Sequence, residues 1–386
     1  MRHRSVNRAT HAVRSPRSPG MLWFGTALAL VGCHEETRRS TTDPCGPDCT
    51  LAVDTAWSSD PDNPDLTLTY SAIERGDSLL IVDARVNRSL ALLGPSGATA
   101  RVVGRAGDGP GEYRSISAID AHPDGRVFVF DRRRLTVLDT ALRVALLFPL
   151  PMTVEKGVVL LDGTAVVDGS RRIGDSTFTL HLIGEGGQLL SSFDPSVGDA
   201  TSRFIARGRD NTVWSAPRIA SAPEYRIDRW DPRTGRLLQS IRDEPSWFTW
   251  TPPTYSADER ACRGGDRSAC DRADQAPRPP RAPIPTILHL WESDDGLLWI
   301  VSYKADSAWA SSPPSDYRRR LDSVVEVRDA RTGGLIATRE FDEYLTGFTN
   351  VGGLVMHDMD DQDRPRHTLI RVSVRRSTGK PAPRGE

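Results

Sequence analysis

Several features are scarce in this chain of 386 residues. The longest largely apolar run, residues 21–32, falls short of the ~20 residues that span a bilayer, which excludes a polytopic membrane protein. The formal net charge is only −1, so there is no electrostatic case for nucleic-acid binding. Lysine occurs only at positions 156, 304 and 380, and the arginines that supply the remaining positive charge are scattered. With 38% hydrophobic and 26% charged residues, the chain has the composition of an ordinary folded protein with a solvated surface of mixed charge.

Cysteine is also scarce, and four of the five cysteines form two local pairs along the sequence. Cys45 and Cys49 enclose Gly-Pro-Asp, and Cys262 and Cys270 enclose a segment of seven residues. An even number of thiols in an exported chain indicates disulfides, and proximity favours pairing within each local pair. Four cysteines still allow three connectivities. The alternative, a four-thiolate zinc site, does not fit, because these spacings match no zinc pattern that we recognise.

The N-terminus reads as an export signal. Residues 1–20 are basic and polar, and the twelve residues 21–32 would form only about 18 Å of helix, against a hydrocarbon core of roughly 30 Å. Such a run suits the apolar region of a signal peptide. It ends in Leu30-Val31-Gly32-Cys33, which resembles the lipobox of bacterial lipoproteins. The resemblance implies removal of residues 1–32 and lipidation of Cys33; the alternative is an ordinary signal peptide with a chance cysteine.

The predicted anchor sets the expected location. Two or three acyl chains on Cys33 would hold the protein stably on a membrane, where one chain would not. His34 follows the cysteine in place of an aspartate, so we expect attachment to the outer membrane of a Gram-negative envelope, facing the periplasm or the surface. Residues 33–64 are polar and predict a flexible tether, and residues 376–386 predict a disordered tail.

From about residue 65 the chain repeats with a period near 45 residues. One unit, an alternating strand, a tight turn and a second strand, occurs five times. Its turns begin at Gly94, Asp139, Gly184, Asp231 and Asp329, at intervals of 45, 45, 47 and 98 residues. A second motif, a polar turn followed by a buried-type strand, precedes each unit, so that each period holds four strands.

Four antiparallel strands in each period are typical of a β-propeller blade, which buries its faces only by stacking on neighbours. Five complete blades are visible, and we expect a sixth from residues 351–375 joined to the strand Leu66–Tyr70 near the start. The predicted fold is therefore an all-β, six-bladed propeller over residues 65–375, with four-stranded antiparallel blades and a ring closed by the two chain ends. Two separate β-sandwiches would explain neither the period nor the unpaired terminal strands.

Two stretches carry a family resemblance. Residues 102–113 (VVGRAGDGPGEY) and 119–131 (IDAHPDGRVFVFD) resemble the second-blade region of six-bladed β-propeller lipoproteins of the NHL-like and TolB-like group. The resemblance extends over residues 65–375 in pattern, but it is specific only over the first two blades. It implies the fold and the location and adds little about chemistry, because most members are uncharacterised.

Two kinds of motif could bind ligands, but their sequences are more typical of turns. Gly107, Gly109 and Gly111 precede neither Gly-Lys-Ser/Thr nor a helix, so we expect them to shape the passage between blades and not to hold phosphate. The acidic clusters at residues 60–65 and 358–363 lack the glycine and the glutamate of a calcium loop. We expect solvated turns at both places.

No residue pattern predicts a catalytic, cofactor-binding or metal-binding set, and we assign none. The histidines show no HExxH motif, and no Ser–His–Asp pattern can be argued. His122, His289 and His357 lie near predicted innermost strands, where a propeller could gather them at its channel mouth. Several Asp, Glu, Asn or His side chains converging there would indicate a metal-dependent hydrolase or lactonase.

Residues 243–285 depart from the repeat. An aromatic stretch at 246–255 is followed by the Cys262–Cys270 segment and by a run rich in proline and arginine. Proline removes a ladder donor, so we expect an irregular insertion over 246–285 and not a seventh blade. It could carry function, as long loops on rigid scaffolds do, or be a proline-rich excursion with its aromatics packed on a blade. We predict a monomeric, membrane-anchored binding or scaffold module for a protein, peptide or glycan partner, and the hydrolase is the alternative.

Overall fold

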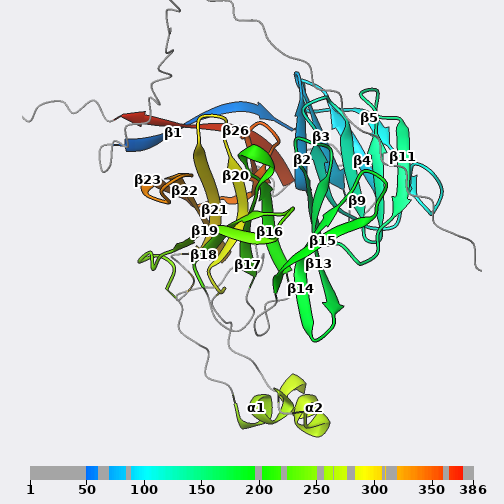
Figure 1. The fold of residues 1–386 in the computed structure, drawn as a ribbon. Coiled ribbons are helices and arrows are strands. Elements are labelled where there is room, and N and C mark those ends of the chain that lie inside the picture. Colours follow the sequence, from blue (N-terminus) through cyan, green and yellow to red (C-terminus); the bar gives the residue numbers. More distant parts are fainter. Residues whose placement is uncertain are drawn as a thin grey trace, which may run out of the picture. The chain divides into compact units, whose positions relative to one another are not determined.

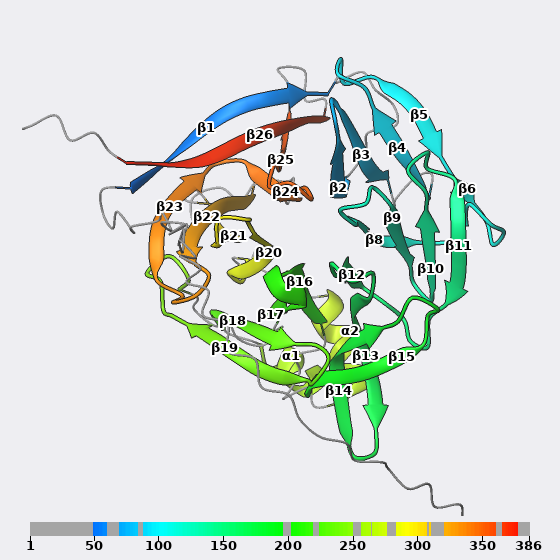
Figure 2. The same cartoon turned by 45° about the horizontal axis from the view of Figure 1, so that its top comes forward.

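The computed structural model describes residues 49–59, 69–83, 88–195, 202–218, 224–249, 256–263, 265–275, 283–306, 309, 320–359 and 365–376. Six four-stranded antiparallel sheets surround a central axis, and each sheet forms one blade of a ring (Figure 1, Figure 2). The predicted all-β, six-bladed propeller is therefore confirmed. The 98-residue interval holds one blade and inserted segments and not two blades.

The blades follow one another along the chain, and each is named here from its innermost to its outermost strand. Blade 1 consists of β2 (Thr69–Arg75), β3 (Ser78–Asp83), β4 (Ser89–Leu93) and β5 (Thr99–Val103). Blade 2 consists of β8 (Ile116–Ala121), β9 (Val127–Asp131), β10 (Arg134–Leu138) and β11 (Val144–Pro149). Blade 3 consists of β12 (Lys156–Val159), β13 (Ala165–Ile173), β14 (Ser176–Ile183) and β15 (Leu189–Pro195).

The second half of the ring has the same plan. Blade 4 consists of β16 (Ser202–Arg207), β17 (Val213–Arg218), β18 (Arg226–Asp231) and β19 (Arg236–Arg242). Blade 5 consists of β20 (Thr286–Glu292), β21 (Leu297–Ala305), β22 (Leu321–Asp329) and β23 (Leu335–Phe341). Blade 6 consists of β24 (Tyr344–Phe348), β25 (Leu354–Met359), β26 (Pro365–Arg376) and β1 (Cys49–Ser58).

The repeated turns are stabilised by their own side chains. Each of the five predicted turn starts either ends the third strand of its blade or directly follows it. In three of these turns one aspartate oxygen accepts hydrogen bonds from two later backbone amides; these residues are Asp139, Asp231 and Asp329. Such Asx turns reverse the chain without help from tertiary contacts, which explains why they could be read from the sequence.

The ring is closed by the N-terminal strand of the described chain. β1 pairs antiparallel with β26 from Cys49 opposite Arg376 to Ser58 opposite Thr368. The predicted tether over residues 33–64 is therefore wrong for Cys49–Ser58. Leu66–Tyr70 was wrong as the closing segment too: its end, from Thr69, begins the innermost strand of blade 1. Cys49, Leu51 and Val53 alternate toward the core, but the polar sequence on either side made this short alternation hard to recognise as a strand.

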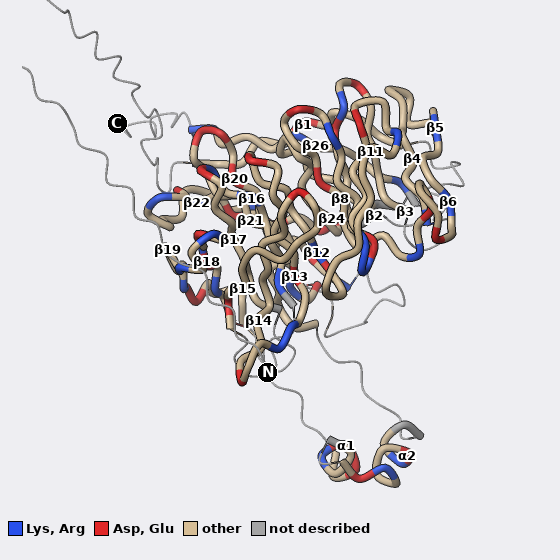
Figure 3. The backbone as a smooth tube through the Cα atoms, turned by 45° about the vertical axis from the view of Figure 1, so that its right-hand side comes forward, with Lys and Arg blue, Asp and Glu red and all other residues tan. Residues whose placement is uncertain are grey.

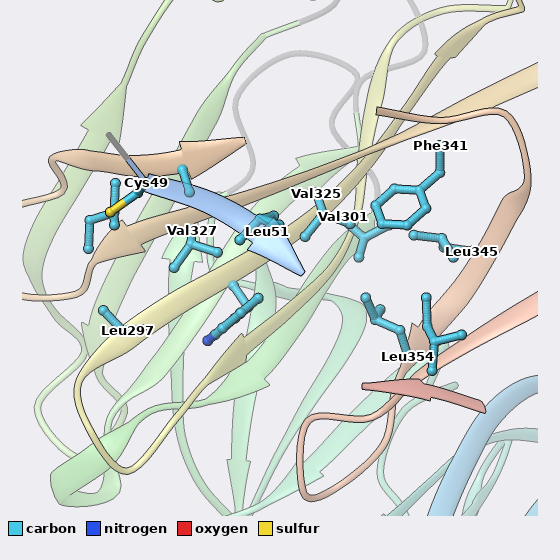
Figure 4. Packing of buried hydrophobic residues seen from close by; sticks show 13 residues of the cluster. Cys49, Leu51, Leu297, Val301, Val325, Val327, Phe341, Leu345 and Leu354 are labelled. Carbon is cyan, nitrogen blue, oxygen red and sulfur yellow. The ribbon is translucent and has the colours of Figure 1, made fainter. Parts of the chain in front are cut away.

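Charged residues of both signs are interspersed along the described chain, as the scattered arginines predict (Figure 3). The apolar residues lie between neighbouring blades. Blades 5 and 6 share one buried cluster, to which β1 contributes Cys49 and Leu51 (Figure 4). A second cluster joins blades 6 and 1 and includes Trp57, whose Nε1 donates to the carbonyl of Gly94 at 3.1 Å. β1 therefore contributes to the packing on both sides of blade 6.

The insertion between β19 and β20 contains two helices, α1 (Ala257–Arg263) and α2 (Arg267–Gln275). The expectation of an irregular segment is wrong here. Ser256 and Glu259 form a reciprocal capping box at the start of α1, with amide-to-side-chain distances of 2.8 and 3.2 Å. Asp266 caps the start of α2 by accepting from two amides. A disulfide between Cys262 and Cys270 joins the two helices. Within the described residues no helix is long and apolar enough to cross a membrane.

Candidate functional site

The innermost strands β2, β8, β12, β16, β20 and β24 line the central channel of the ring (Figure 2). The channel holds a cavity of about 140 Å³, which residues from all six blades border. Main chain and small or apolar side chains form much of its wall. The polar side chains on the wall are Ser71, Asp120, Lys156, Arg207, His289, Glu292, Thr349 and Asn350.

A wider cavity of about 970 Å³ opens at one end of the channel, among the turns that follow the innermost strands. We call it the mouth. Arg207, Trp291, Glu292 and Asn350 border both cavities, so the mouth leads directly into the channel. The rim combines charge with exposed apolar groups: blade 3 contributes Leu161, which is 49% exposed, and blade 6 contributes Val351, which is 55% exposed.

Arg207 is held rigidly where the channel meets the mouth. It belongs to the innermost strand of blade 4, and its Nη1 donates to the carbonyls of Ala121 in blade 2 and Val159 in blade 3, both at 3.1 Å. One guanidinium thus ties three blades together. These bonds use only Nη1, and a guanidinium carries five N–H donors, so Arg207 has donors to offer a ligand.

Asp120 lies beside Arg207 in the channel wall. One carboxylate oxygen accepts from the amide of Val159 at 2.7 Å and the other from the amide of Ala121 at 2.8 Å. Burial raises the pKa of Asp120 above its ordinary value, although the charge of Arg207 and the two amides oppose the rise. The Val159 bond links blades 2 and 3, so the carboxylate also fixes the spacing of the wall.

Glu292 and Arg209 form the buried base and the exposed edge of the mouth. The Glu292 side chain is fully buried and accepts from Nε1 of Trp214 at 2.7 Å and from Nε of Arg209 at 2.9 Å. The Arg209 side chain remains 47% exposed. A buried carboxylate paired in this way holds the guanidinium in one place while leaving one side of it to solvent.

Glu74 joins the last blade to the first beneath the rim. Its carboxylate accepts from Arg371 at 2.6 Å and from the hydroxyl of Thr349, and its amide donates to Asn350 at 2.8 Å. Burial raises the pKa of Glu74, but the hydrogen bonds and charge of its partners outweigh burial and hold the pKa below its ordinary value. The carboxylate is therefore ionised at neutral pH.

His289 is the histidine that the structure places in the channel. Burial, aided by the charge of Lys156, lowers the pKa of His289 to about 3, so its imidazole is neutral at neutral pH. The ring lies 6.2 Å from that of Phe204 and against Gly347, where a Cβ would come within 2.9 Å of it. Gly347 also has φ of +149°, so a glycine is needed there twice over.

The other histidines do not join it. Nδ1 of His122 lies 2.9 Å from Asp124 at the mouth, and His357 stacks near His367 on the adjacent strand of blade 6, with ring centroids 5.1 Å apart. Across the described part of the chain, no three His, Cys, Asp or Glu side chains are placed to hold a metal ion. The convergence that would indicate a hydrolase is therefore not seen among these residues. The acidic cluster at 60–65 lies outside them, as does most of 358–363.

The glycine-rich loop serves the fold, as predicted. The Glu112 carboxylate accepts from the amides of Asp108 and Gly109 at 3.0 and 2.8 Å, which closes the loop on itself between blades 1 and 2. A Cβ on Gly104 would come within 2.3 Å of the buried Tyr113 ring, and one on Gly107 within 2.2 Å of Glu112.

Cys33 and Cys45 lie outside the described residues, while Cys49 begins β1 and is disulfide-bonded.

At the base of the insertion, Trp247 and Phe248 pack edge-on against Tyr225, with ring centroids 6.2 and 5.4 Å away. These aromatics therefore pack on blade 4, which was one of the two alternatives.

Sequence reasoning missed Arg207, Glu292, Glu74 and Asp120. The repeat itself contains a signal for two of these residues, Arg207 and Glu292. A turn follows the innermost strand of each blade, and in five blades the residue just before this turn can be compared. These equivalent residues are Ala121, Val159, Arg207, Glu292 and Phe348. Three are apolar, so the charged residues of blades 4 and 5 depart from the repeat at positions that face the channel.

No protein-family model matches the chain, and no curated protein matches it by sequence. Solved structures do match its fold. A candidate exported protein from Bacteroides fragilis aligns over 84% of this chain and 95% of its own, with 13% identity and a TM-score of 0.52. A member of the DUF4221 family from Bacteroides vulgatus aligns over 84% of this chain and 98% of its own, with 7% identity and a TM-score of 0.55.

Fold and site together define a class. The chain is a six-bladed β-propeller with a narrow channel, lined by both polar and apolar groups, that opens into a wide mouth. At 7 and 13% identity, the similarity to the two Bacteroides proteins extends to the fold alone.

Proposed function

We propose that this chain is an exported lipoprotein of the bacterial cell envelope that acts as a binding or scaffold module, with the mouth as its recognition surface. The observation that carries the proposal is the mouth itself, a cavity of about 970 Å³ built from turns of all six blades. Ligand sites are typically concave, with an apolar surface and a few fixed polar groups. Leu161 and Val351 supply the exposed apolar surface, and Arg207 and Arg209 supply fixed polar groups.

The rigidity of the mouth supports recognition of a defined partner. Hydrogen bonds between blades hold its polar groups, including those of Arg207 to blades 2 and 3 and of Glu74 to blade 6. A preformed surface loses little conformational entropy on binding, so more of the contact energy remains as affinity. The size of the cavity suits a loop or terminus of a protein, a peptide or a glycan.

The mouth predicts a selective loss of binding. We expect the purified propeller, used as bait on detergent-solubilised membranes, to capture a partner that Leu161→Glu and Val351→Glu no longer capture. A new carboxylate at an apolar contact would lose its hydration when the partner covers it, and this loss costs binding free energy. Leu237→Glu is the matched control, because Leu237 is 45% exposed but lies on the outermost strand of blade 4. Equal capture by all three variants would place recognition elsewhere.

The anchor is tested separately. The lipobox-like segment ending in Cys33 and the fold shared with a candidate exported protein support an envelope location. We expect Cys33→Ser to release the protein from the membrane fraction or to leave an unprocessed precursor, because serine cannot accept the lipid through sulfur. Unchanged partition and electrophoretic mobility would contradict lipidation.

A further inference from the structure

We propose that a depression lined by arginines, at the end of the ring opposite the mouth, binds a phosphate-bearing ligand. The depression has a volume of about 530 Å³, and the side chains that matter for the argument are those of Arg133, Thr153, Glu155, Ser170, Arg171 and Arg172. It is formed by the turn between β9 and β10, the connection from blade 2 to blade 3, and the end of β13. Successive turns of an antiparallel meander lie at alternate ends, so this end is the one away from the mouth.

The first wall is a two-residue turn made of arginine. Arg132 and Arg133 join β9 to β10, and Arg132 has φ of +51°, a conformation usually taken by glycine or asparagine. The carbonyls of Arg132 and Arg133 each accept a backbone hydrogen bond at 2.7 Å, from Val154 and Leu150. These bonds clamp the neighbouring segment, which supplies Thr153 and Glu155, against the turn.

The opposite wall depends on a β-bulge. The register between β13 and β14 shifts between Asp168 and Arg171, and a bulge of this kind re-aims the side chains that follow it. The backbone at the bulge is held by His181, whose Nε2 lies 2.7 Å from the carbonyl of Gly169. Gly169 is required, because a Cβ there would come within 2.4 Å of the carbonyl of Thr153. The bulge thus turns Arg171 and Arg172 into the depression, whose lining includes both residues.

Among the residues that the structure describes, the positive charge in the depression exceeds the negative charge. In the described part of the chain, Arg133 and Arg171 have no ion pair or hydrogen bond to their guanidinium groups, and Arg172 donates only to the carbonyl of Gly174 at 3.2 Å. Glu155 is the one acidic residue among the described residues of the lining, and it is exposed. Three cations therefore face one anion across a pocket of small-ligand size.

The geometry of the donors points to phosphate. Guanidinium groups present a planar fork of N–H donors that matches two oxygens of a phosphate, and three such groups can satisfy several oxygens at once. The hydroxyls of Thr153 and Ser170 add donors of a type common at phosphate sites. A phosphate could belong to a soluble phosphomonoester or to a phosphodiester headgroup of an envelope lipid, and the recognising chemistry is the same.

The proposal is tested by titrating the full chain with inorganic phosphate, glycerol 3-phosphate and glycerophosphoglycerol, followed by calorimetry and by ³¹P line broadening at low ionic strength. We expect saturable binding that weakens about tenfold in Arg171→Ala and in Arg133→Ala, as loss of one charge-assisted hydrogen bond predicts. Glu155→Gln should bind more tightly, which no merely destabilised variant would do. Arg236→Ala, an exposed arginine on the outermost strand of blade 4, should bind as the unmodified protein does.

Preference for the diester would identify a lipid headgroup as the source, and preference for phosphate or the monoester would identify a soluble ligand. Either preference, or equal binding of all three, supports a phosphate site. Binding that is absent, or that is equal in the arginine variants and in Arg236→Ala, would overturn the proposal. The same result for Glu155→Gln as for the unmodified protein would exclude this depression as the place of binding.

Discussion

Closure of the ring by β1 predicts that a single substitution near the N-terminus weakens the whole propeller. Leu51 lies near the beginning of the chain's described part, is only 6% exposed, and packs in the cluster shared by blades 5 and 6. Its carbonyl also accepts from Nη1 of Arg339 in blade 5 at 2.9 Å. If residues 33–64 were wholly a tether, truncating Leu51 would have no effect.

The magnitude follows from burial. Truncating a buried leucine to alanine costs about 2–5 kcal/mol of unfolding free energy, through lost transfer energy and the cavity left behind. The neighbouring substitution Asp54→Ala should stay within about 0.5 kcal/mol, because Asp54 is exposed and its 3.4 Å contact with Arg375 is a surface ion pair. Trp57→Phe should lie between, at about 0.5–1.5 kcal/mol, since it removes the hydrogen bond to Gly94.

The assay is urea unfolding of the purified protein, followed by far-UV circular dichroism, with the slope of the transition compared among variants. We expect the urea midpoint to be highest for Asp54→Ala, intermediate for Trp57→Phe and lowest for Leu51→Ala, with an unchanged slope of the transition. Equal midpoints for Leu51→Ala and Asp54→Ala would refute the assignment of β1 as the closing strand.

Two further predictions rest on other parts of the ring. Burial raises the pKa of Glu326, although Arg328 and Tyr225 oppose the rise, so the protein should lose stability relative to Glu326→Gln as pH rises above 4.5 toward neutrality. Denaturation midpoints at pH 4 and 7, with Glu340→Gln as the exposed control, test this prediction, and a constant difference would contradict it. Deleting residues 256–282 and bridging the gap with a short Gly/Ser linker should leave cooperative unfolding intact, because the disulfide and the Arg272–Asp258 ion pair join the two helices to each other. The deletion should weaken partner capture if the insertion contributes to recognition, and loss of cooperative unfolding would place the segment in the core.

The blades could be predicted because their signals are local. Turn aspartates such as Asp231 bind their own following amides, and strands alternate with a fixed spacing, so five blades could be read from the sequence. The closing strand could not be predicted, because β1 is recognisable as a blade strand only through its pairing with β26, more than three hundred residues away. The helices of the insertion carried a readable signal in Ser256 and Glu259, which proline and arginine on either side obscured.

The site was harder to predict than the fold because it exists only after the ring forms. Arg207 becomes a channel residue through carbonyls of blades 2 and 3, and neither contact is encoded near it in the sequence. Glu292 likewise depends on Arg209 and Trp214 from the preceding blade. A repeat alignment shows that both residues are unusual for their position, but it does not show what they face.

The pairing of β1 with β26 also has a consequence for how such a chain reaches its native state. A polypeptide that is made or moved with its N-terminus first delivers β1 more than three hundred residues before β26. Until residues 365–376 are available, β1 and β25 both lack the strand that lies between them in blade 6, and the contacts between β1 and β26 are among the most distant in sequence. In any synthesis or transport that proceeds from the N-terminus, the ring can therefore close only after β26 has appeared. A chain interrupted before β26 would present unpaired strand edges and apolar surface to proteases and to other chains. The presence of β26 therefore decides whether the whole ring is protected from both.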